Sequence, residues 1–419
     1  MMRQIAPLPL AACLALASPL FADDWPQWRG PARDGVAVGV ELPAALPASL
    51  GEVWSVEVGT GHASPVVMGQ RLYVHARVDG SEVVRALNLA DGTEIWNRSI
   101  EVAYTPDDYA LIHGRGPKST PVVSGESICV LGITGVLTCL DRESGEVRWE
   151  RDFEGRFDRA WPEFGTAMSP AVFGGRLIAH VGGKQSGALI AFDLESGEEA
   201  WSWTGDSPGY SSPVLASLDD VQQIVTQSRS KVVALSPETG KPLWEMPFET
   251  DYEQNCVTPL LAGERIIISG LDQGVFALEP RRDPQGSWVI TTAWKNDTAP
   301  MYMSSPVLRD DLLFGMTDKR KGQLFSADLA TGEVRWVSEG REGDNAALIL
   351  AGDRLLVQTT EGELLVGKVV GESWAVEARY AVANSPTWAH PAVVEAGIVI
   401  KDETHVRLLS FGSGSASSR

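Results

Sequence analysis

The sequence predicts an all-β protein, an eight-bladed β-propeller of four-stranded antiparallel blades over residues 51–411, closed by an N-terminal strand that joins the last blade. Three observations predict this fold. A tryptophan recurs at spacings of 42–53 residues, a Ser-Pro or Thr-Pro pair recurs upstream of it, and short apolar runs separated by turn residues fill each interval. Repeats of about 40–50 residues that hold four short strands are typical of propeller blades.

The tryptophan closes an eleven-residue phrase that returns along the chain. The phrase reads "ALNLADGTEIW" at residues 86–96, "AFDLESGEEAW" at 191–201 and "SADLATGEVRW" at 326–336. Its Asp or Asn and its Gly favour a turn between the third and fourth strands, and the indole offers a large flat face for packing between blades. We therefore expect structural roles for Trp54, Trp96, Trp149, Trp201, Trp244, Trp294 and Trp336.

The hydroxyl-proline pair marks the start of each unit. A short apolar run follows the proline, then a turn, then an alternating run such as "RLYVHA" or "RIIISG", which is the pattern of a strand. With the recurring phrase this makes four strands per unit and leaves no helical stretch between units. The pairs are Ser64-Pro65, Thr120-Pro121, Ser169-Pro170, Ser212-Pro213, Thr258-Pro259 and Ser305-Pro306.

The ring closes where the repeat degenerates. Six units are clear, a seventh covers residues 347–380 with Tyr380 in the tryptophan position, and an eighth, residues 390–411, supplies three strands. The segment "GEVWSVEV", residues 51–58, has the strand pattern and carries Trp54 one repeat before Trp96. We expect it to provide the missing fourth strand, which leaves no open sheet edge at the seam.

The N-terminus has the features of an export signal. Residues 1–22 combine Arg3 with a nearly continuous apolar run and end in Ala22, a plausible cleavage position. This predicts a periplasmic or secreted protein. The alternative is a lipid anchor at Cys13, because "LAAC" resembles a lipoprotein cleavage box. No later stretch reaches the roughly 18 apolar residues of a membrane helix. Residues 23–50 are expected to form a leader packed on the propeller, and residues 412–419 a disordered tail.

Charge and cysteine content restrict the partners. The formal net charge is −20, which disfavours nucleic acid because an acidic surface repels phosphates. Cys129 and Cys139 lie on consecutive strand-like runs, so a cross-strand disulfide is one interpretation, but we favour two buried free thiols. Together with Cys256 their spacing does not suit a zinc site.

The recurring phrase resembles the A-x-D-x-x-T-G-x-x-x-W motif of the PQQ-binding-like, quinoprotein-type propeller repeats. "AFDLESGEEAW", "SADLATGEVRW" and "CLDRESGEVRW" carry the resemblance, and "WPQWRGPARDGVA" at residues 25–37 resembles a leader of secreted proteins of this kind. Such proteins are similar both to PQQ-dependent alcohol dehydrogenases and to the propeller lipoprotein of the outer-membrane barrel-assembly machine. The fold does not decide between an enzyme and a scaffold.

The resemblance to dehydrogenases implies PQQ with Ca²⁺, a catalytic Asp and a disulfide between adjacent cysteines. The chain has no Cys-Cys pair and no C-x-x-C-H haem sequence, and the calcium and catalytic positions have no match. We therefore expect a non-catalytic exported scaffold, with no established cofactor, that binds a protein or ligand in the bacterial envelope. The alternative is a PQQ- and Ca-containing oxidoreductase acting on alcohols or sugars.

A binding site is expected at one mouth of the central channel, because the first strands of the blades line it. The position three before each proline is chemically mixed, and two long connections, residues 97–118 and 150–167, lead to the same mouth; long loops are often functional. For these two loops we favour a solvated, salt-bridged cap, and the alternative is that their cationic and aromatic groups hold an anionic or planar ligand. No catalytic residue or metal ligand stands out. The candidate cofactor- or ligand-binding residues are His62, Lys118, Tyr210, Met303, Asn345, Trp388, His113 and Arg115, with Ala167 and Cys256 in equivalent positions.

These features predict an envelope or secreted protein partner, or a small ligand at the channel mouth. We expect the protein to be a monomer without a transmembrane helix.

Overall fold

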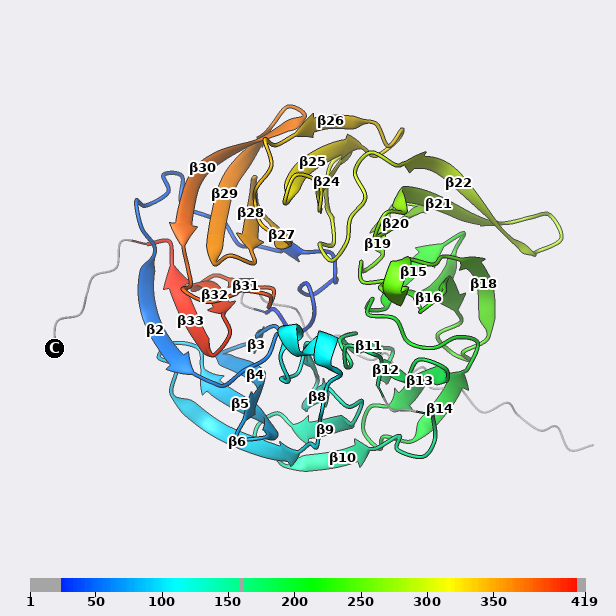
Figure 1. Ribbon diagram of the computed structural model, residues 1–419, viewed down its shortest axis with the longest axis horizontal. Coiled ribbons are helices and arrows are strands. Elements are labelled where there is room, and N and C mark those ends of the chain that lie inside the picture. The colour runs from blue at the N-terminus through cyan, green and yellow to red at the C-terminus, as the bar shows by residue number, and fades with distance from the viewer. Residues whose placement is uncertain (1–23, 159–160, 413–419) are drawn as a thin grey trace, which may run out of the picture.

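The structure is a ring of β-sheets around a central axis (Figure 1). It is a computed structural model that describes residues 24–158 and 161–412. The expected signal segment with Cys13 lies outside these residues, as does the expected tail apart from Gly412. Within the described part of the chain the strands form eight sheets, seven of four strands and one of five. The predicted eight-bladed propeller is confirmed.

The first four blades follow the chain in order, each from its innermost to its outermost strand. Blade 1 contains β3 (Val66–Met68), β4 (Arg71–Val78), β5 (Ser81–Asn88) and β6 (Glu94–Glu101). Blade 2 contains β7 (Val122–Ser124), β8 (Ser127–Leu131), β9 (Leu137–Asp141) and β10 (Val147–Arg151). Blade 3 contains β11 (Ala171–Phe173), β12 (Arg176–Gly182), β13 (Gly187–Asp193) and β14 (Glu199–Trp203). Blade 4 contains β15 (Val214–Leu218), β16 (Val221–Gln227), β17 (Lys231–Leu235) and β18 (Pro242–Pro247).

The remaining blades complete the circle. Blade 5 contains β19 (Leu260–Ala262), β20 (Arg265–Gly270), β21 (Gly274–Arg282) and β22 (Trp288–Asn296). Blade 6 contains β23 (Val307–Arg309), β24 (Leu312–Thr317), β25 (Gln323–Asp328) and β26 (Val334–Val337). Blade 7 contains β27 (Ala346–Ala351), β28 (Arg354–Thr359), β29 (Glu363–Val370) and β30 (Ser373–Ala381). Blade 8 contains β31 (Ala392–Val394), β32 (Gly397–Lys401), β33 (His405–Ser410) and β2 (Gly51–Glu57).

The N-terminal strand closes the ring as predicted. The strand β2 pairs antiparallel with β33, and Trp54 lies opposite Leu408. A second N-terminal strand was not foreseen. The short β1 (Val36–Ala37) pairs in parallel with the inner edge of blade 7, opposite Leu350 and Ala351, and makes that blade five-stranded. Before the first complete blade begins, the N-terminal segment therefore pairs with two strands of the C-terminal third of the chain.

The hydrophobic core is divided among the spaces between blades. Strands inside a blade, such as β8, are buried along their whole length, because neighbouring blades cover both faces. Outer strands such as β6 are only intermittently covered. One cluster joins Val84 and Ala86 of blade 1 to Ile128 and Val130 of blade 2. Burial of this kind is the main favourable contribution to folding.

The recurring tryptophans contact the next blade. The indole Nε1–H donates to a backbone carbonyl at the end of the next blade's third strand, over 2.8–3.1 Å. The ring also lies against the glycine of the following turn, where an added Cβ would come within 2.2–2.8 Å of the indole. The pairs of tryptophan and glycine are Trp54 and Gly92, Trp96 and Gly145, Trp149 and Gly197, Trp201 and Gly240, and Trp294 and Gly332.

Two tryptophans of the series differ. Trp244 donates to the side-chain oxygen of Gln223 in its own blade, because blade 5 replaces the glycine turn with the long β21–β22 hairpin visible at the upper right of Figure 1. Trp336 is only partly buried next to blade 7, which also lacks the phrase. In blade 7 the hydroxyl of Tyr380, which replaces the tryptophan, donates to Pro47 of the leader.

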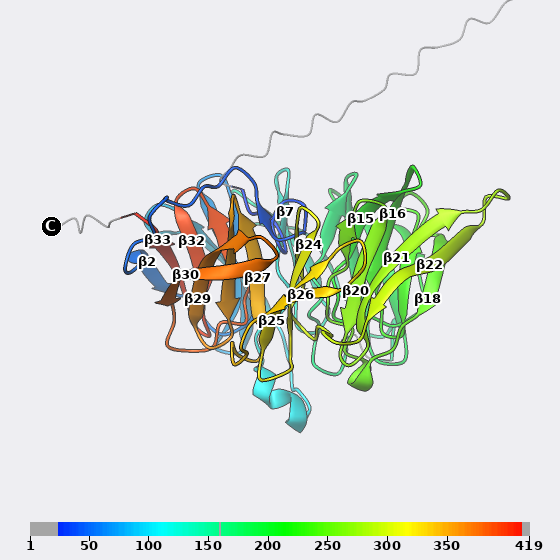
Figure 2. The same cartoon turned by 90° about the horizontal axis from the view of Figure 1, so that it is seen from above.

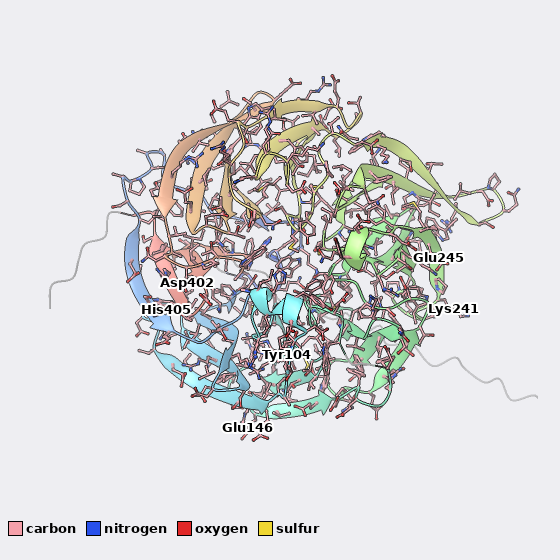
Figure 3. All side chains as sticks on the ribbon, in the orientation of Figure 1. Tyr104, Glu146, Lys241, Glu245, Asp402 and His405 are labelled. Carbon is pink, nitrogen blue, oxygen red and sulfur yellow. A yellow bond between two sulfur atoms is a disulfide. The ribbon has the colours of Figure 1, made fainter. Side chains whose placement is uncertain are left out.

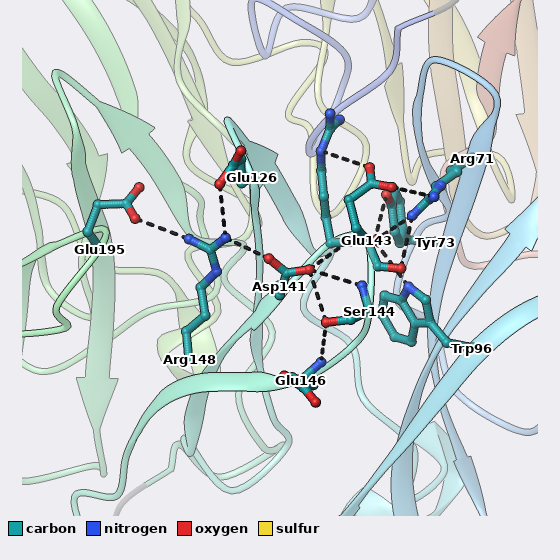
Figure 4. Close-up of polar contacts among 11 residues, drawn as sticks. Arg71, Tyr73, Trp96, Glu126, Asp141, Glu143, Ser144, Glu146, Arg148 and Glu195 are labelled. Carbon is teal, nitrogen blue, oxygen red and sulfur yellow. Dashed lines mark hydrogen bonds and ion pairs between the residues drawn. The ribbon is translucent and has the colours of Figure 1, made fainter.

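Polar contacts reinforce the same turns. In blade 2 the carboxylate of Asp141 accepts hydrogen bonds from the backbone N–H and the hydroxyl of Ser144, which fixes the turn after β9 (Figure 4). The guanidinium of Arg148 lies 2.7 Å from Asp141 and 3.1 Å from Glu195 of blade 3. Hydrogen bonds from Arg148 and Ser144 lower the pKa of Asp141 to about 2. Exposed pairs of this type add little stability individually.

Cys129 and Cys139 form a disulfide, so the expectation of two free thiols is wrong. The residues lie directly opposite each other on β8 and β9, with their Cα atoms 4.1 Å apart. Direct cross-strand pairing brings two side chains on the same face within bonding reach. Cys256 is a free thiol.

The hydroxyl residue before each proline has a role that the sequence did not reveal. In five of the six hydroxyl-proline pairs, all except that of Thr258, the hydroxyl oxygen accepts a hydrogen bond from the backbone N–H of the equivalent residue in the preceding blade, which links neighbouring blades around the axis. The donor–acceptor pairs are Ser64 to Thr120, Thr120 to Ser169, Ser169 to Ser212, Thr258 to Ser305 and His390 to Ser64, over 2.9–3.2 Å. We call this set of bonds the hydroxyl collar.

The leader, residues 24–50, closes one side of the channel. Trp25 pairs with Val67 of blade 1, and the buried Arg29 donates to the carbonyl of Pro306 in blade 6. The buried Arg33 donates to the carbonyls of Ser169 and Pro170 in blade 3, at 2.9 and 3.1 Å. Figure 2 shows this segment in blue on the opposite side of the ring from the cyan 3₁₀ helix η1 (Asp108–His113). The leader thus ties blades on different sides of the axis together.

The contact between a tryptophan and its glycine can be tested with Gly240→Ala. We expect a loss of about 1–3 kcal/mol in the free energy of unfolding through the clash with Trp201, since the new Cβ would lie 2.3 Å from the indole. Gly263→Ala is the matched control, because Gly263 has a similar positive φ of 61° but nothing within 4 Å. Urea unfolding measures both variants. If both variants lost the same unfolding free energy, the loss would come from backbone strain at a positive φ and not from the clash with Trp201.

Acid should weaken the leader's contact with blade 8. Burial, and then Arg29, lower the pKa of His390 to about 3, and its ring lies 4.3 Å from that of Trp28. The stability conferred by neutral His390 is present above its unfolded pKa of about 6.5 and is lost as the pH falls toward 3. At pH 5 the loss approaches roughly 2 kcal/mol.

His390→Phe keeps a ring against Trp28 but does not titrate. In urea unfolding at pH 7 and pH 5, we expect the variant to lose less stability than the wild type between the two pH values. An identical loss in both proteins would rule out His390 as the titrating group.

Candidate functional site

A cavity of about 170 Å³ lies at the centre of the ring. It lies between η1, which covers one mouth of the channel in the middle of Figure 1, and Trp28 of the leader. We call the η1 side the loop face. Side chains project into the middle of the ring around η1, with Tyr104 below it, whereas Lys241 and Glu245 lie at the outer rim (Figure 3). The lining residues are Trp28, His62, His113, Lys118, Phe164, Ala167, Tyr210, Ser212, Gln254, Cys256, Met303 and Trp388.

Most of the candidate residues meet at this cavity. The position three before the proline is brought together by the ring symmetry, and it supplies His62, Lys118, Ala167, Tyr210, Cys256, Met303 and Trp388. His113 joins them from η1. Asn345 does not line the cavity, because its backbone pairs with Thr360 at the next turn of its own blade. Arg115 is exposed and does not line it either.

Other lining residues were not predicted individually. Phe164 lies in the long 150–167 connection, and Gln254 lies two residues before the aligned Cys256. Ser212 belongs to the hydroxyl collar. Trp28 belongs to the "WPQWRG" segment. Its two tryptophans indicate that this segment packs against the protein, but the sequence does not indicate where. Only the path of the leader into the channel reveals that role.

Aromatic rings surround the cavity. Trp388 lies 6.1 Å from His62 and 6.4 Å from His113, measured between ring centroids. Phe164 lies 5.4 Å from His113 and 6.1 Å from Tyr210, both edge to face. Edge-to-face pairs at such separations are favourable. These five aromatic and imidazole rings come from five different connections between blades. Together they give the cavity a mainly apolar wall.

Trp28 is held firmly on the opposite side. Its indole Nε1–H donates to the hydroxyl of Thr258 over 2.9 Å, and its ring packs on His390. Thr258 takes part in the hydroxyl collar through its backbone N–H, and its hydroxyl oxygen accepts the hydrogen bond from the leader. The cavity is therefore bounded by a residue that has no equivalent in the repeats.

Lys118 is the cation of the cavity. Its Nζ donates to the carbonyl of Phe164 at 2.5 Å, and burial lowers its pKa to about 8. Burial, followed by Lys118 and Lys401, lowers the pKa of His62 to about 3, so the His62 imidazole is neutral at pH 7. His62 Nε2 lies 3.2 Å from the carbonyl of His113, so it must carry the hydrogen and donate. Burial also lowers the pKa of His113.

A second buried lysine lies behind His62. Lys401 Nζ donates to the carbonyls of Gly59, Gly61, Asp402 and Glu403, over 2.7–3.4 Å. Burial lowers its pKa to about 8. Lys401 does not line the cavity, but its positive charge contributes to the field that keeps His62 neutral.

The cavity does not fit the pairing of PQQ with calcium that the sequence resemblance implied. Calcium prefers several carboxylate and carbonyl oxygens, and no carboxylate is among the described lining residues. Among the described side chains of residues 24–158 and 161–412, which exclude that of Glu253, no cluster of three or more His, Cys, Asp or Glu could hold a metal. The disulfide joins residues ten positions apart inside blade 2, and burial raises the pKa of the Cys256 thiol to about 12. These residues offer neither a calcium site nor an activated nucleophile.

Large apolar side chains are exposed beside the cavity. On η1, Ile112 is 84% exposed, Tyr109 52% and Leu111 43%. On η2 (Asp251–Glu253), Tyr252 is 76% exposed and adopts a left-handed φ of 59°. Figure 2 shows both helical turns projecting from the same face of the ring. We call these four residues the apolar crest. Among the described residues, no helix has the length and apolar character needed to cross a membrane.

Proteins of similar sequence are outer membrane protein assembly factors named BamB. The protein of Shewanella oneidensis is 27% identical over 228 residues, which cover 52% of this chain and 55% of that protein. The protein of Burkholderia pseudomallei is 24% identical over 196 residues, 47% of this chain and 46% of that protein. The chain thus spans about half the length of these curated relatives.

Solved structures of two kinds share the fold. The quinohemoprotein alcohol dehydrogenase from Comamonas testosteroni matches with a TM-score of 0.69 and 16% identity, over 95% of this chain and 82% of that chain. BamB from Moraxella catarrhalis matches with a TM-score of 0.60 and 16% identity, over 86% and 99%. Identity this low shows the fold alone. The family described as outer membrane protein assembly factor BamB matches residues 80–338, more than half of the sequence, and the chain therefore belongs to that family.

Proposed function

We propose that the protein is a non-catalytic scaffold of the bacterial envelope that binds a protein partner through its loop face. Membership in the BamB family supports a role in outer membrane protein assembly, and the relatives carry that name. The proposed location is the periplasmic side of the envelope, reached through the signal-like residues 1–22, with a lipid anchor at Cys13 as the alternative to simple secretion.

The observation that carries the proposal is the apolar crest. The side chain of Ile112 in η1 is 84% exposed, and covering its apolar surface with a partner would lower the free energy of the system. Four large exposed side chains on one face, beside a mouth lined with aromatic rings, are the kind of exposed apolar surface that marks protein interfaces.

The alternative function is a PQQ-dependent oxidoreductase acting on alcohols or sugars. The position of the cavity on the ring axis and the fold shared with an alcohol dehydrogenase favour it. The lack of carboxylates among the described lining residues argues against a calcium-bound quinone. The two functions predict different results in two experiments.

The crest can be tested with the double variant Leu111→Ser and Ile112→Ser. We expect affinity capture of outer-membrane assembly components from envelope extracts to fall by roughly tenfold or more. Thermal stability should stay close to that of the wild type, because both side chains are exposed. Val38→Ser is the matched control, since Val38 is 64% exposed in the leader. Equal capture by the wild type and the double variant, measured by quantitative mass spectrometry, would refute the proposed surface.

The enzymatic alternative can be tested by adding PQQ and Ca²⁺ to the purified protein. We expect no dye-linked oxidation of primary alcohols or aldose sugars above the protein-free rate, because the lining supplies no calcium ligands. Turnover that disappears in Lys118→Met would establish the oxidoreductase and overturn the scaffold proposal.

A further inference from the structure

The cavity has an unusual charge balance for a protein with a net charge of −20. Lys118 is the one lining residue in the described chain that carries a formal charge at neutral pH, since His62 and His113 have lowered pKa values. Among the described side chains, which exclude that of Glu253, no carboxylate forms an ion pair with it. Its amino group makes one hydrogen bond, to the carbonyl of Phe164. A cation in this position has N–H groups left for a ligand.

A second donor lies in the same lining. Gln254 is buried, and its side-chain oxygen accepts a hydrogen bond from the hydroxyl of Tyr302. This leaves its amide N–H groups as donors, and in the described structure they bond to no protein acceptor. The lining thus contains an ammonium and an amide N–H, from the loops before blades 2 and 5, and each can donate to a carboxylate oxygen.

The rest of the wall suits an apolar body. Trp28, Phe164, Met303 and Trp388 contribute apolar surface, and the two neutral imidazoles add flat faces. The volume of about 170 Å³ is below the roughly 300–1,000 Å³ of sites for drug-sized ligands. The cavity is therefore sized for a small group rather than for a large multi-ring cofactor.

We propose that this cavity binds a small organic carboxylate, with its charged end at Lys118 and its apolar body between the aromatic rings. The proposal goes beyond the scaffold function and does not depend on the apolar crest. The carboxylate belongs either to a free small molecule or to the C-terminus of a peptide, and both present the same chemistry.

The lining distinguishes a carboxylate from other charged ligands. A phosphate dianion calls for more than one cation or for an Arg fork, whereas the described lining offers one lysine. A cationic ligand could contact the aromatic faces but would be repelled by Lys118. A neutral apolar ligand would leave the ammonium desolvated without a counter-charge, which is costly.

Isothermal titration calorimetry with 3-phenylpropionate, 3-phenylpropanol and inorganic phosphate tests the proposal. We expect the carboxylate to bind the wild type at least about tenfold more tightly than the alcohol, and phosphate to bind no better than the alcohol. Lys118→Met should weaken carboxylate binding by roughly tenfold to a hundredfold. Lys319→Met, which removes an exposed lysine on the same face in blade 6, should have no effect.

A folding defect can be separated from a lost contact. Lys118→Met removes a buried charge, so its thermal unfolding midpoint should not fall below that of the wild type, and its affinity for phenylpropanol should be retained. Equal affinities of the wild type for the carboxylate and the alcohol would overturn the proposal. So would unchanged carboxylate binding by a folded Lys118→Met protein.

Peptides distinguish the two sources of the carboxylate. Acetyl-Ala-Phe with a free C-terminus is compared with its C-terminal amide. Preference for the free acid over the amide supports a peptide terminus as ligand, and binding of phenylpropionate without such a preference supports a free small molecule. Failure of both acids to bind overturns the proposal.

The crest variant Leu111→Ser and Ile112→Ser should bind the carboxylate as the wild type does. Loss of partner capture with intact carboxylate binding would show that the two surfaces act independently. Failure of the carboxylate to bind, with partner capture intact, would remove this inference and leave the scaffold function standing.

Discussion

The architecture depends on contacts that each blade makes with the next one. At the axis, a backbone N–H donates to the hydroxyl of the neighbouring blade. Farther out, an indole lies on the neighbouring glycine turn and donates to a carbonyl beside it. A four-stranded blade buries its faces only against other blades, so these contacts set the angle at which the apolar faces meet. The positions of all loop-face residues, and hence the cavity, follow from that angle.

The leader provides hydrogen-bond partners for the inner strands of the ring. A ring of eight sheets leaves inner strand edges with unpaired backbone groups around the channel, and buried backbone groups need partners. The leader supplies them: Trp25 pairs with Val67, β1 adds to blade 7, and Arg29 and Arg33 bond carbonyls of blades 6 and 3. By filling one side of the channel it also turns an open pore into a closed-ended cavity with Trp28 as a wall.

The repeats made the fold and much of the cavity predictable from sequence. The position before the proline is periodic, so its members, from His62 to Trp388, could be aligned and expected at one mouth. Prediction failed where a residue depends on non-periodic contacts. The backbone of Asn345 bonds to Thr360 of its own blade, and Arg115 is exposed, so neither residue lines the cavity. Trp28 does line the cavity, but it belongs to a segment outside the repeats. The disulfide was misjudged because sequence spacing does not give the strand register that sets Cys129 opposite Cys139.

The closure of the ring by its N-terminal residues has a consequence for biosynthesis. The partners of β1 and β2 lie more than 300 positions later in the chain, at Leu350 and at residues 405–410. Contacts between such distant residues form slowly, because a long loop must close first. While the chain is being made, the early blades can form their own hairpins, but β1 and β2 gain their strand partners only when blades 7 and 8 have been made. The nascent protein therefore exposes open sheet edges until its final strands are made, and such edges favour edge-to-edge aggregation during that period.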